Sequence, residues 1–93
     1  MTDTSPCDAF KALSDPNRIR IVEMLADGEK CACRFLDGME LSQPTLSHHM
    51  KVLIEAGLVR SRKEGKWVYY RLNRDNLRAV AGHLLSISEE NDV

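Results

Sequence analysis

The stretch LSQPTLSHHMKVLIEAGLV, residues 41–59, predicts an amphipathic helix with clear signals at both ends. Ser42 is a typical N-cap residue, Pro44 falls in the first turn, and Gly57 follows the last periodic residue. On a helical wheel one side is apolar and consists of Leu46, Met50, Leu53 and Ile54. The other side carries Pro44, Ser47, His48, Lys51 and Glu55. We therefore expect one face to be buried and the other to present a short row of hydrogen-bonding groups.

The segments before this helix predict three shorter helices. One is expected in residues 7–13, and Asp15 with Pro16 is a strong start for a second that ends at Gly28. The segment CACRFLDGMEL, residues 31–41, has room for about two turns, with the chain turning at Gly38. A brief helix, a turn and an amphipathic helix together make a helix-turn-helix.

The segments after it predict a hairpin and a last helix. Residues 58–62 and 67–72 are rich in β-branched and aromatic side chains and flank the glycine-containing turn KEGK. Asn73 can cap a helix over 74–88, whose apolar stripe consists of Leu77, Val80, Ala81, Leu84 and Leu85. The predicted fold is mainly α with a small β-hairpin: a winged helix-turn-helix in which the hairpin is the wing.

Length and composition indicate a single domain over residues 1–93, with 1–5 and 89–93 expected to be frayed. No apolar run approaches the roughly 18 residues of a membrane span, so no membrane partner is expected. The start MTDTSPCDAF does not resemble an export signal. A cytoplasmic location is therefore expected.

Basic residues are concentrated in one segment. The whole chain has a net charge of −1, but residues 60–74 contain six basic side chains and one acid, which gives this segment +5 and leaves −6 elsewhere. Such a stripe is typical of a contact with the phosphate backbone, although a merely solvated hairpin would have similar charges.

Two sets of residues are predicted to bind double-stranded DNA. The base-reading set, on the polar side of the amphipathic helix, is Gln43, Thr45, Ser47, His48 and Lys51. The backbone set, on the wing, is Arg60, Arg62, Lys63 and Lys66. The alternative is a solvated helix surface, and His49, near the apolar edge, is expected to be a packing residue.

The three cysteines, Cys7, Cys31 and Cys33, favour a metal or redox site over a disulfide framework, because cytosolic thiols stay reduced. Cys31 and Cys33 lie where the brief helix begins, a position that lowers thiol pKa values. Residues two apart on a regular helix point about 200° apart, so both sulfurs can hold one ion only if the first turn is irregular or unwinds. Cys7 is a candidate third ligand or a surface thiol.

The chain closely resembles the ArsR/SmtB family of metal- and metalloid-responsive repressors, from about Phe10 to Leu72. The resemblance rests on ALSDPNRIRIVEML (12–25), CAC (31–33), LSQPTLSHHMKVLIEAGLV (41–59) and RKEGKWVYYRL (62–72). It implies a homodimer that contacts its partner through the first and last helices and holds an operator until an inducer ion binds.

The resemblance also implies roles for the cysteines. Cys31 and Cys33 match the arsenic-responsive pattern Cys-x-Cys-x-x-Cys, but Leu36 stands in the third position. Relatives that respond to cadmium or lead supply N-terminal cysteines from the other subunit, as Cys7 could.

The sequence thus predicts a homodimeric repressor, with no obligatory cofactor, that binds a pseudo-palindromic operator with half-sites about one turn apart. The expected inducer is trivalent arsenic or antimony bound by Cys31 and Cys33, with Cys7 as a possible third ligand. The alternatives are cadmium or lead, or thiol oxidation with Cys7 bridging to Cys31 or Cys33. An enzyme is not expected, because Ser47, His48 and His49 lack an orienting acid.

Overall fold

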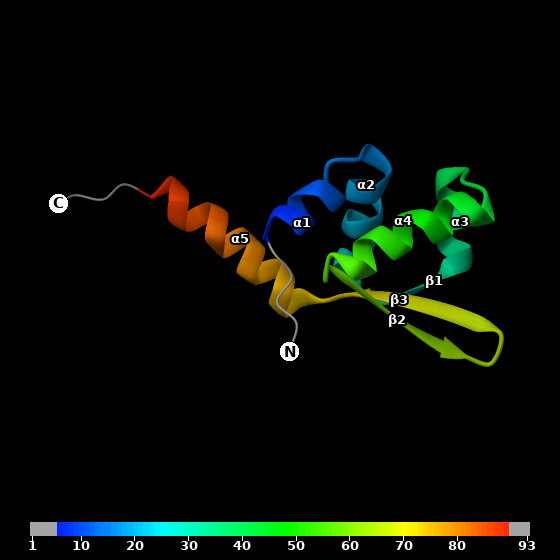
Figure 1. The fold of residues 1–93 in the computed structure, drawn as a ribbon. Helices are drawn as coiled ribbons and strands as arrows, with labels where there is room; N and C mark the ends of the chain where they lie inside the picture. The colour runs from blue at the N-terminus through cyan, green and yellow to red at the C-terminus, as the bar shows by residue number, and fades with distance from the viewer. Residues whose placement is uncertain (1–5, 90–93) are drawn as a thin grey trace.

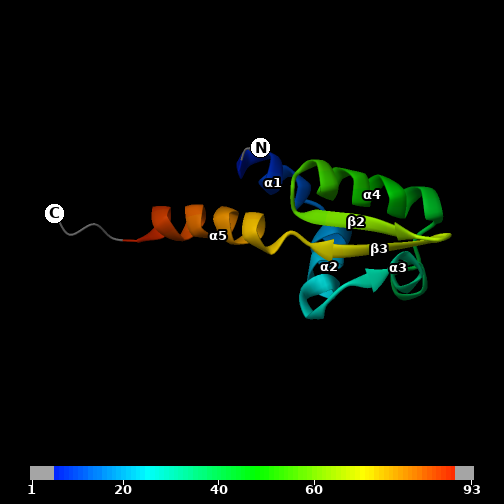
Figure 2. The ribbon, with the colours of Figure 1, turned by 90° about the horizontal axis from the view of Figure 1, so that it is seen from below.

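The computed structural model describes residues 6–89 and shows helices packed on one face of a small antiparallel sheet, with one helix projecting from the body (Figures 1 and 2). The elements are α1 (Pro6–Ala12), α2 (Pro16–Met24), the 3₁₀ helix η1 (Leu25–Asp27), β1 (Lys30–Cys31), α3 (Ala32–Met39), α4 (Gln43–Glu55), β2 (Val59–Glu64), β3 (Trp67–Leu72) and α5 (Arg74–Ser88). The predicted winged helix-turn-helix is confirmed, with α3 and α4 as the two helices of the motif and β2–β3 as the wing. The expected fraying of 1–5 and 89–93 lies outside the described residues, except for Glu89, which follows the end of α5.

Side-chain caps begin three of the helices, as the sequence predicts. The Asp15 carboxylate accepts hydrogen bonds from the backbone N–H of Asn17 (2.8 Å) and Arg18 (3.3 Å) at the start of α2. Ser42 Oγ accepts from the backbone N–H of Thr45 at 3.3 Å, which fixes the first turn of α4. Asn73 has the same role at α5.

The predicted turn at Gly38 is wrong. Gly38 lies inside α3, which continues to Met39, and the left-handed residue is Glu40, with φ at 54°. One further helical residue brings Met39 against the buried core, and this packing outweighs the helix-breaking tendency of glycine.

The sheet has one strand more than the predicted hairpin. Its order is β1-β3-β2, and the short strand β1 pairs antiparallel with β3 through Lys30 opposite Tyr70 and Cys31 opposite Tyr69. Two residues are too few to show a strand pattern in the sequence. The consequence is that the first residue of the Cys-x-Cys motif belongs to the same sheet as the wing.

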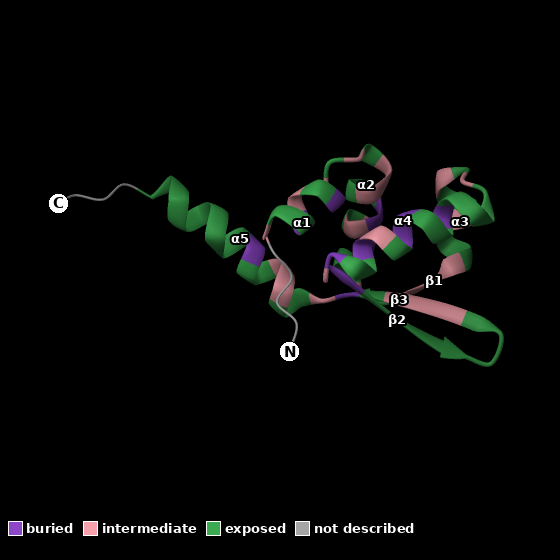
Figure 3. Ribbon diagram, viewed as in Figure 1, coloured by how far each residue is buried: buried purple, intermediate pink, exposed green. Residues whose placement is uncertain are grey.

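The core lies between α2, α3, α4 and the sheet (Figure 3). Its largest fully buried side chains are Phe35, Ile21, Leu25, Leu46, Met50, Leu53, Leu58 and Val59. Phe35 of α3 meets Tyr70 of β3 edge to face, with ring centroids 6.2 Å apart. Ile54 was predicted to face inward but is exposed. It follows Met50 by four residues, which places its side chain about 40° further round the helix, at the edge of the apolar face.

His49 is a packing residue, as predicted. Its side chain is buried, and its Nδ1 lies 3.2 Å from Nη1 of Arg18, while Arg18 Nε donates to the carbonyl of Ala12 at 2.6 Å. Burial lowers the pKa of His49, so the neutral ring accepts a hydrogen bond from Arg18 and joins α4 to α2.

The last helix, α5, leaves most of its apolar stripe uncovered. Val80 is buried, but Leu84, Leu85 and Ile87 are 52%, 61% and 68% exposed, and Figure 1 shows α5 extending away from the body. The radius of gyration is 14.6 Å, against about 12 Å for a compact chain of this length. Within residues 6–89, no helix is both long and apolar enough to cross a membrane.

Truncating two neighbouring residues of α4 should separate buried from exposed positions. Leu53→Ala removes a fully buried side chain, and we expect it to lower the free energy of unfolding by about 2–5 kcal/mol. Ile54→Ala, at an exposed position, should cost no more than roughly 0.5 kcal/mol. Urea unfolding at one protein concentration measures both, and equal losses would contradict the packing described here.

Candidate functional site

The polar face of α4 is presented to solvent. All five predicted base-reading residues, Gln43, Thr45, Ser47, His48 and Lys51, are exposed. Ser42 Oγ also donates to Thr45 Oγ1 at 2.8 Å, so this hydroxyl helps to order the first turn. An ordered helix start with exposed donors and acceptors suits the major groove of DNA.

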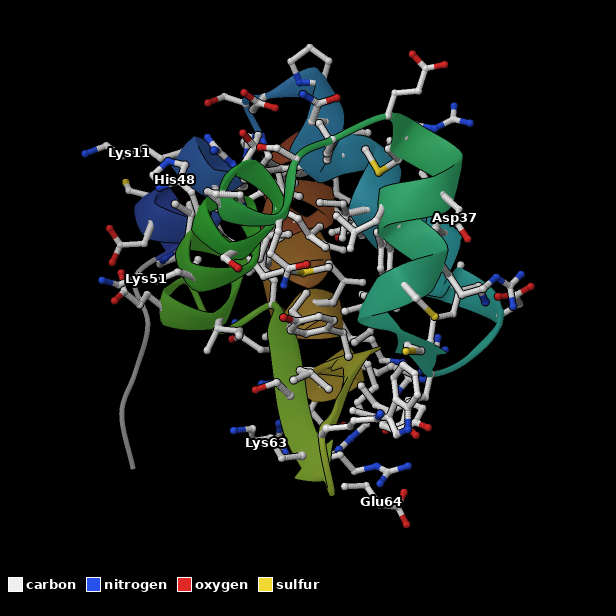
Figure 4. All side chains as sticks on the ribbon, turned by 90° about the vertical axis from the view of Figure 1, so that its right-hand side faces the viewer. Lys11, Asp37, His48, Lys51, Lys63 and Glu64 are labelled. Carbon is white, nitrogen blue, oxygen red and sulfur yellow. The ribbon has the colours of Figure 1, made fainter. Side chains whose placement is uncertain are left out.

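Basic side chains from three elements lie on the same side of the molecule. Figure 4 shows His48 and Lys51 of α4 on the side that also carries Lys63 of the wing and Lys11 of α1, with Asp37 of α3 on the opposite side. Lys11 was not singled out in the sequence, because nothing local distinguishes an exposed lysine on a short helix. Its position adds α1 to the candidate DNA-facing surface.

Arg62 does not resemble the other wing cations. Its guanidinium donates to both carboxylate oxygens of Glu29, at 2.9 and 2.8 Å, and to Glu64 at 2.9 Å. It also lies 4.6 Å from the ring centroid of Tyr69. Arg60, Lys63 and Lys66 are exposed, and none of the ion pairs among the described residues involves them.

We therefore reassign Arg62. The sequence predicted a phosphate contact, but two carboxylates already neutralise its charge, and the hydrogen bond from Arg62 lowers the pKa of Glu29. Arg62 instead ties the wing to the segment that precedes β1. The sequence could not reveal this pair, because Glu29 and Arg62 are 33 residues apart.

The two cysteines of the Cys-x-Cys motif line the same cavity. Cys31 is the N-cap of α3, with an extended backbone (φ −69°, ψ 148°), and Cys33 lies in the first turn. The neighbouring Cys31 thiol, burial and the carboxylate of Asp37 raise the pKa of Cys33.

This geometry bears on two expectations. The helix start is irregular in the sense that the sequence required, because Cys31 precedes the helix with an extended backbone and the separation of about 200° on a regular helix does not apply. The pKa of Cys33 is raised, not lowered, because a neighbouring thiol and a carboxylate outweigh the effect of the helix start.

A cavity of about 190 Å³ adjoins the thiols. Its wall includes Cys31, Cys33, Leu36, Gln43, Lys66 and Trp67. It therefore joins the start of α3, the first residue of α4 and the wing next to its turn. Leu36 and Trp67 were not predicted as site residues. Leu36 was noted only because it replaces a cysteine of the arsenic-responsive pattern. An apolar side chain gives no signal in the sequence that it lines a binding site.

Cys7 does not join the pair within one chain. It is exposed on α1, and Figures 1 and 2 show α1 and α3 near opposite ends of α4. Across residues 6–89, three or more His, Cys, Asp or Glu side chains nowhere come together as a metal-binding group. Within the described part of one chain, Cys7 therefore does not complete a three-sulfur site with Cys31 and Cys33.

Comparison with known proteins agrees with this geometry. Residues 15–61 match the family model described as bacterial regulatory protein, arsR family. An arsenical resistance operon repressor of Staphylococcus xylosus is 51% identical over 75 residues, which cover 81% of this chain and 72% of the repressor. The chain belongs to the ArsR family. It is therefore a DNA-binding transcriptional regulator and not an enzyme, as the sequence predicted.

Two solved structures support the assignment of this ArsR-family fold. A crystal structure of a possible transcriptional regulator for arsenical resistance has a TM-score of 0.79 and 32% identity, covering 89% of this chain and 86% of that one. A solution structure of a homodimeric winged helix-turn-helix DNA-binding domain from Mycobacterium bovis has a TM-score of 0.72 and 30% identity, covering 89% of this chain and 78% of that one.

Removing single charges should distinguish the DNA-facing side from the rest of the surface. Lys51→Gln and Lys63→Gln should each weaken duplex binding. Each should also reduce the steepness of the slope of log affinity against log salt concentration by about 0.9 for each phosphate that the variant no longer neutralises. Arg78→Gln, which removes an exposed charge on α5, is the matched control and should leave the slope unchanged. Fluorescence anisotropy over a salt series measures all three, and equal slopes for all variants would refute the assigned surface.

Proposed function

We propose that this ArsR-family chain is a homodimeric repressor that binds a pseudo-palindromic operator and is released by trivalent arsenic or antimony. In this proposal Cys31 and Cys33 bind the inducer, with Cys7 of the partner subunit as a candidate third ligand. Gln43, Thr45, Ser47, His48 and Lys51 read the major groove, and Arg60, Lys63 and Lys66 contact phosphates. The protein acts in the cytoplasm, where its thiols stay reduced.

The observation that carries the proposal is that two cysteines line one cavity together with the first residue of the helix that would read DNA. Adjacent sulfur ligands select soft ions over calcium or magnesium. The similarity to a repressor of an arsenical resistance operon supports arsenic as the soft ion.

The uncovered face of α5 supports the homodimer. Leu84, Leu85 and Ile87 are more than half exposed. Exposed apolar surface of this kind is unfavourable in water and is typical of a face that a partner covers. The similar domain from Mycobacterium bovis is homodimeric. A two-fold dimer would place two α4 helices in successive major grooves, with half-sites about one turn apart.

The sheet supplies a path from the thiols to the DNA-binding surface. Cys31 pairs with Tyr69 in the central strand β3, so a shift of its backbone acts on the wing. The same cavity reaches Gln43, so a bound group also acts on the first turn of α4. Coupling of typically ~1–3 kcal/mol would lower operator affinity by roughly 5- to 150-fold.

Release of DNA by arsenite tests the proposal. A duplex selected from a random pool by the reduced protein serves as the operator, and native mass spectrometry follows the complex. We expect two chains per duplex, and arsenite should dissociate the wild type but neither Cys31→Ser nor Cys33→Ser, both of which should still bind DNA. Loss of release in Cys7→Ser would show that Cys7 is a third ligand.

Parallel arms separate the alternatives. Cadmium, lead and mild peroxide are added in place of arsenite, and release by one of these alone would identify a different signal. Undiminished release by arsenite in both Cys31→Ser and Cys33→Ser would end the proposal.

A further inference from the structure

Much of the lining of the cavity beside the thiols is apolar. Besides Cys31 and Cys33, it consists of Ala32, Leu36, Trp67 and Val68, with Gln43 and Lys66 as the polar members. A dry apolar cavity of about 150 Å³ is large enough to bind benzene, so a volume of about 190 Å³ can accept a group up to the size of a phenyl ring. Nothing in binding a bare ion requires such a space.

The number of sulfurs at the site also leaves room for a group other than a thiol. Trivalent arsenic forms three single bonds, and two thiols, those of Cys31 and Cys33, line this cavity. Leu36 follows Cys33 by three residues on α3, which places its side chain on the same face of the helix, and it lines the cavity. The third bond of a captured arsenic atom therefore has an apolar neighbour in place of a sulfur from the same helix.

We propose that the site prefers monosubstituted trivalent arsenicals, such as methyl- or phenylarsenous acid, over arsenite. This inference rests on the proposed function, in which Cys31 and Cys33 bind the inducer. An acid R–As(OH)₂ has two exchangeable hydroxyl groups, one for each thiol, and its carbon substituent R then lies against Leu36, Trp67 and Val68.

The capture reaction is a double exchange without oxidation or reduction. Two As–O bonds break and two As–S bonds form, to Sγ of Cys31 and Sγ of Cys33. Each leaving hydroxide takes a thiol proton and departs as water, and the As–C bond stays intact. The arsenic remains trivalent and three-coordinate, with two sulfurs and one carbon.

Burial of the substituent sets the size of the preference. Each methyl-sized group removed from water should raise the affinity about fourfold, so a phenyl group should raise it by roughly tenfold or more. This gain must be separated from the intrinsic preference of any dithiol for one arsenical over another.

Competition against dithiothreitol makes this separation, because it offers two thiols and no apolar wall. The full-length protein, reduced with a phosphine, is titrated with arsenite, methylarsenous acid or phenylarsenous acid in the presence of dithiothreitol. We expect the protein-to-dithiothreitol affinity ratio to be roughly tenfold or more higher for phenylarsenous acid than for arsenite, with methylarsenous acid between them.

Variants at Leu36 test the structural cause. Leu36→Ala should reduce the preference for the phenyl compound, because the apolar wall recedes. Leu36→Cys should reverse it, because a third sulfur can take the third bond of arsenite. Far-UV circular dichroism checks that both variants fold. If either variant is unfolded, the protein-to-dithiothreitol affinity ratios of the wild type decide whether the inference holds.

The outcomes separate this inference from the proposed function. Equal ratios for the three compounds in the wild type, with arsenite losing three waters on binding, would overturn the inference and leave an arsenite sensor with a third ligand. Failure of every arsenical to bind Cys31 and Cys33 would overturn the proposed function, and the inference with it.

Discussion

The pairing of Lys30–Cys31 with Tyr69–Tyr70 is the contact on which the proposed mechanism depends. It is the shortest strand pairing in the described sheet, yet it makes the start of α3 part of the same sheet as the wing. Cys31 is both the last residue of β1 and the N-cap of α3, its backbone is extended, and it lines the same cavity as Cys33. On a regular helix, side chains two residues apart would instead point about 200° apart.

A second contact holds the wing in the same arrangement. Arg62 joins β2 to Glu29, immediately before β1, and its guanidinium lies over Tyr69 of β3. Such exposed pairs add little stability individually, and this network matters more for orientation than for folding. The thiols, the wing and the first turn of α4 thus surround one small cavity, so a group bound there contacts both elements that would grip DNA.

Local signals made most of the fold predictable, because each is confined to a few neighbouring residues. Asp15, Ser42 and Asn73 cap helices as expected, and the wing strands follow their β-branched and aromatic runs. Features that depend on distant partners were not predictable in the same way: β1 exists only through β3, and Arg62 is neutralised by a carboxylate far away in the sequence. The prediction for Gly38 was wrong because packing outweighs the low helix propensity of glycine. The prediction for Ile54 was wrong because a helical wheel does not show how wide the buried face of the helix is.

Emission from Trp67, the only tryptophan, reports directly on the central claim that thiol capture acts on the wing. Trp67 is half exposed and lines the cavity next to Cys31 and Cys33. Stoichiometric arsenite, added to the reduced protein without DNA, should change its emission in the wild type and leave Cys33→Ser unchanged. Unchanged emission from wild-type protein whose thiols have demonstrably bound arsenic would contradict the account.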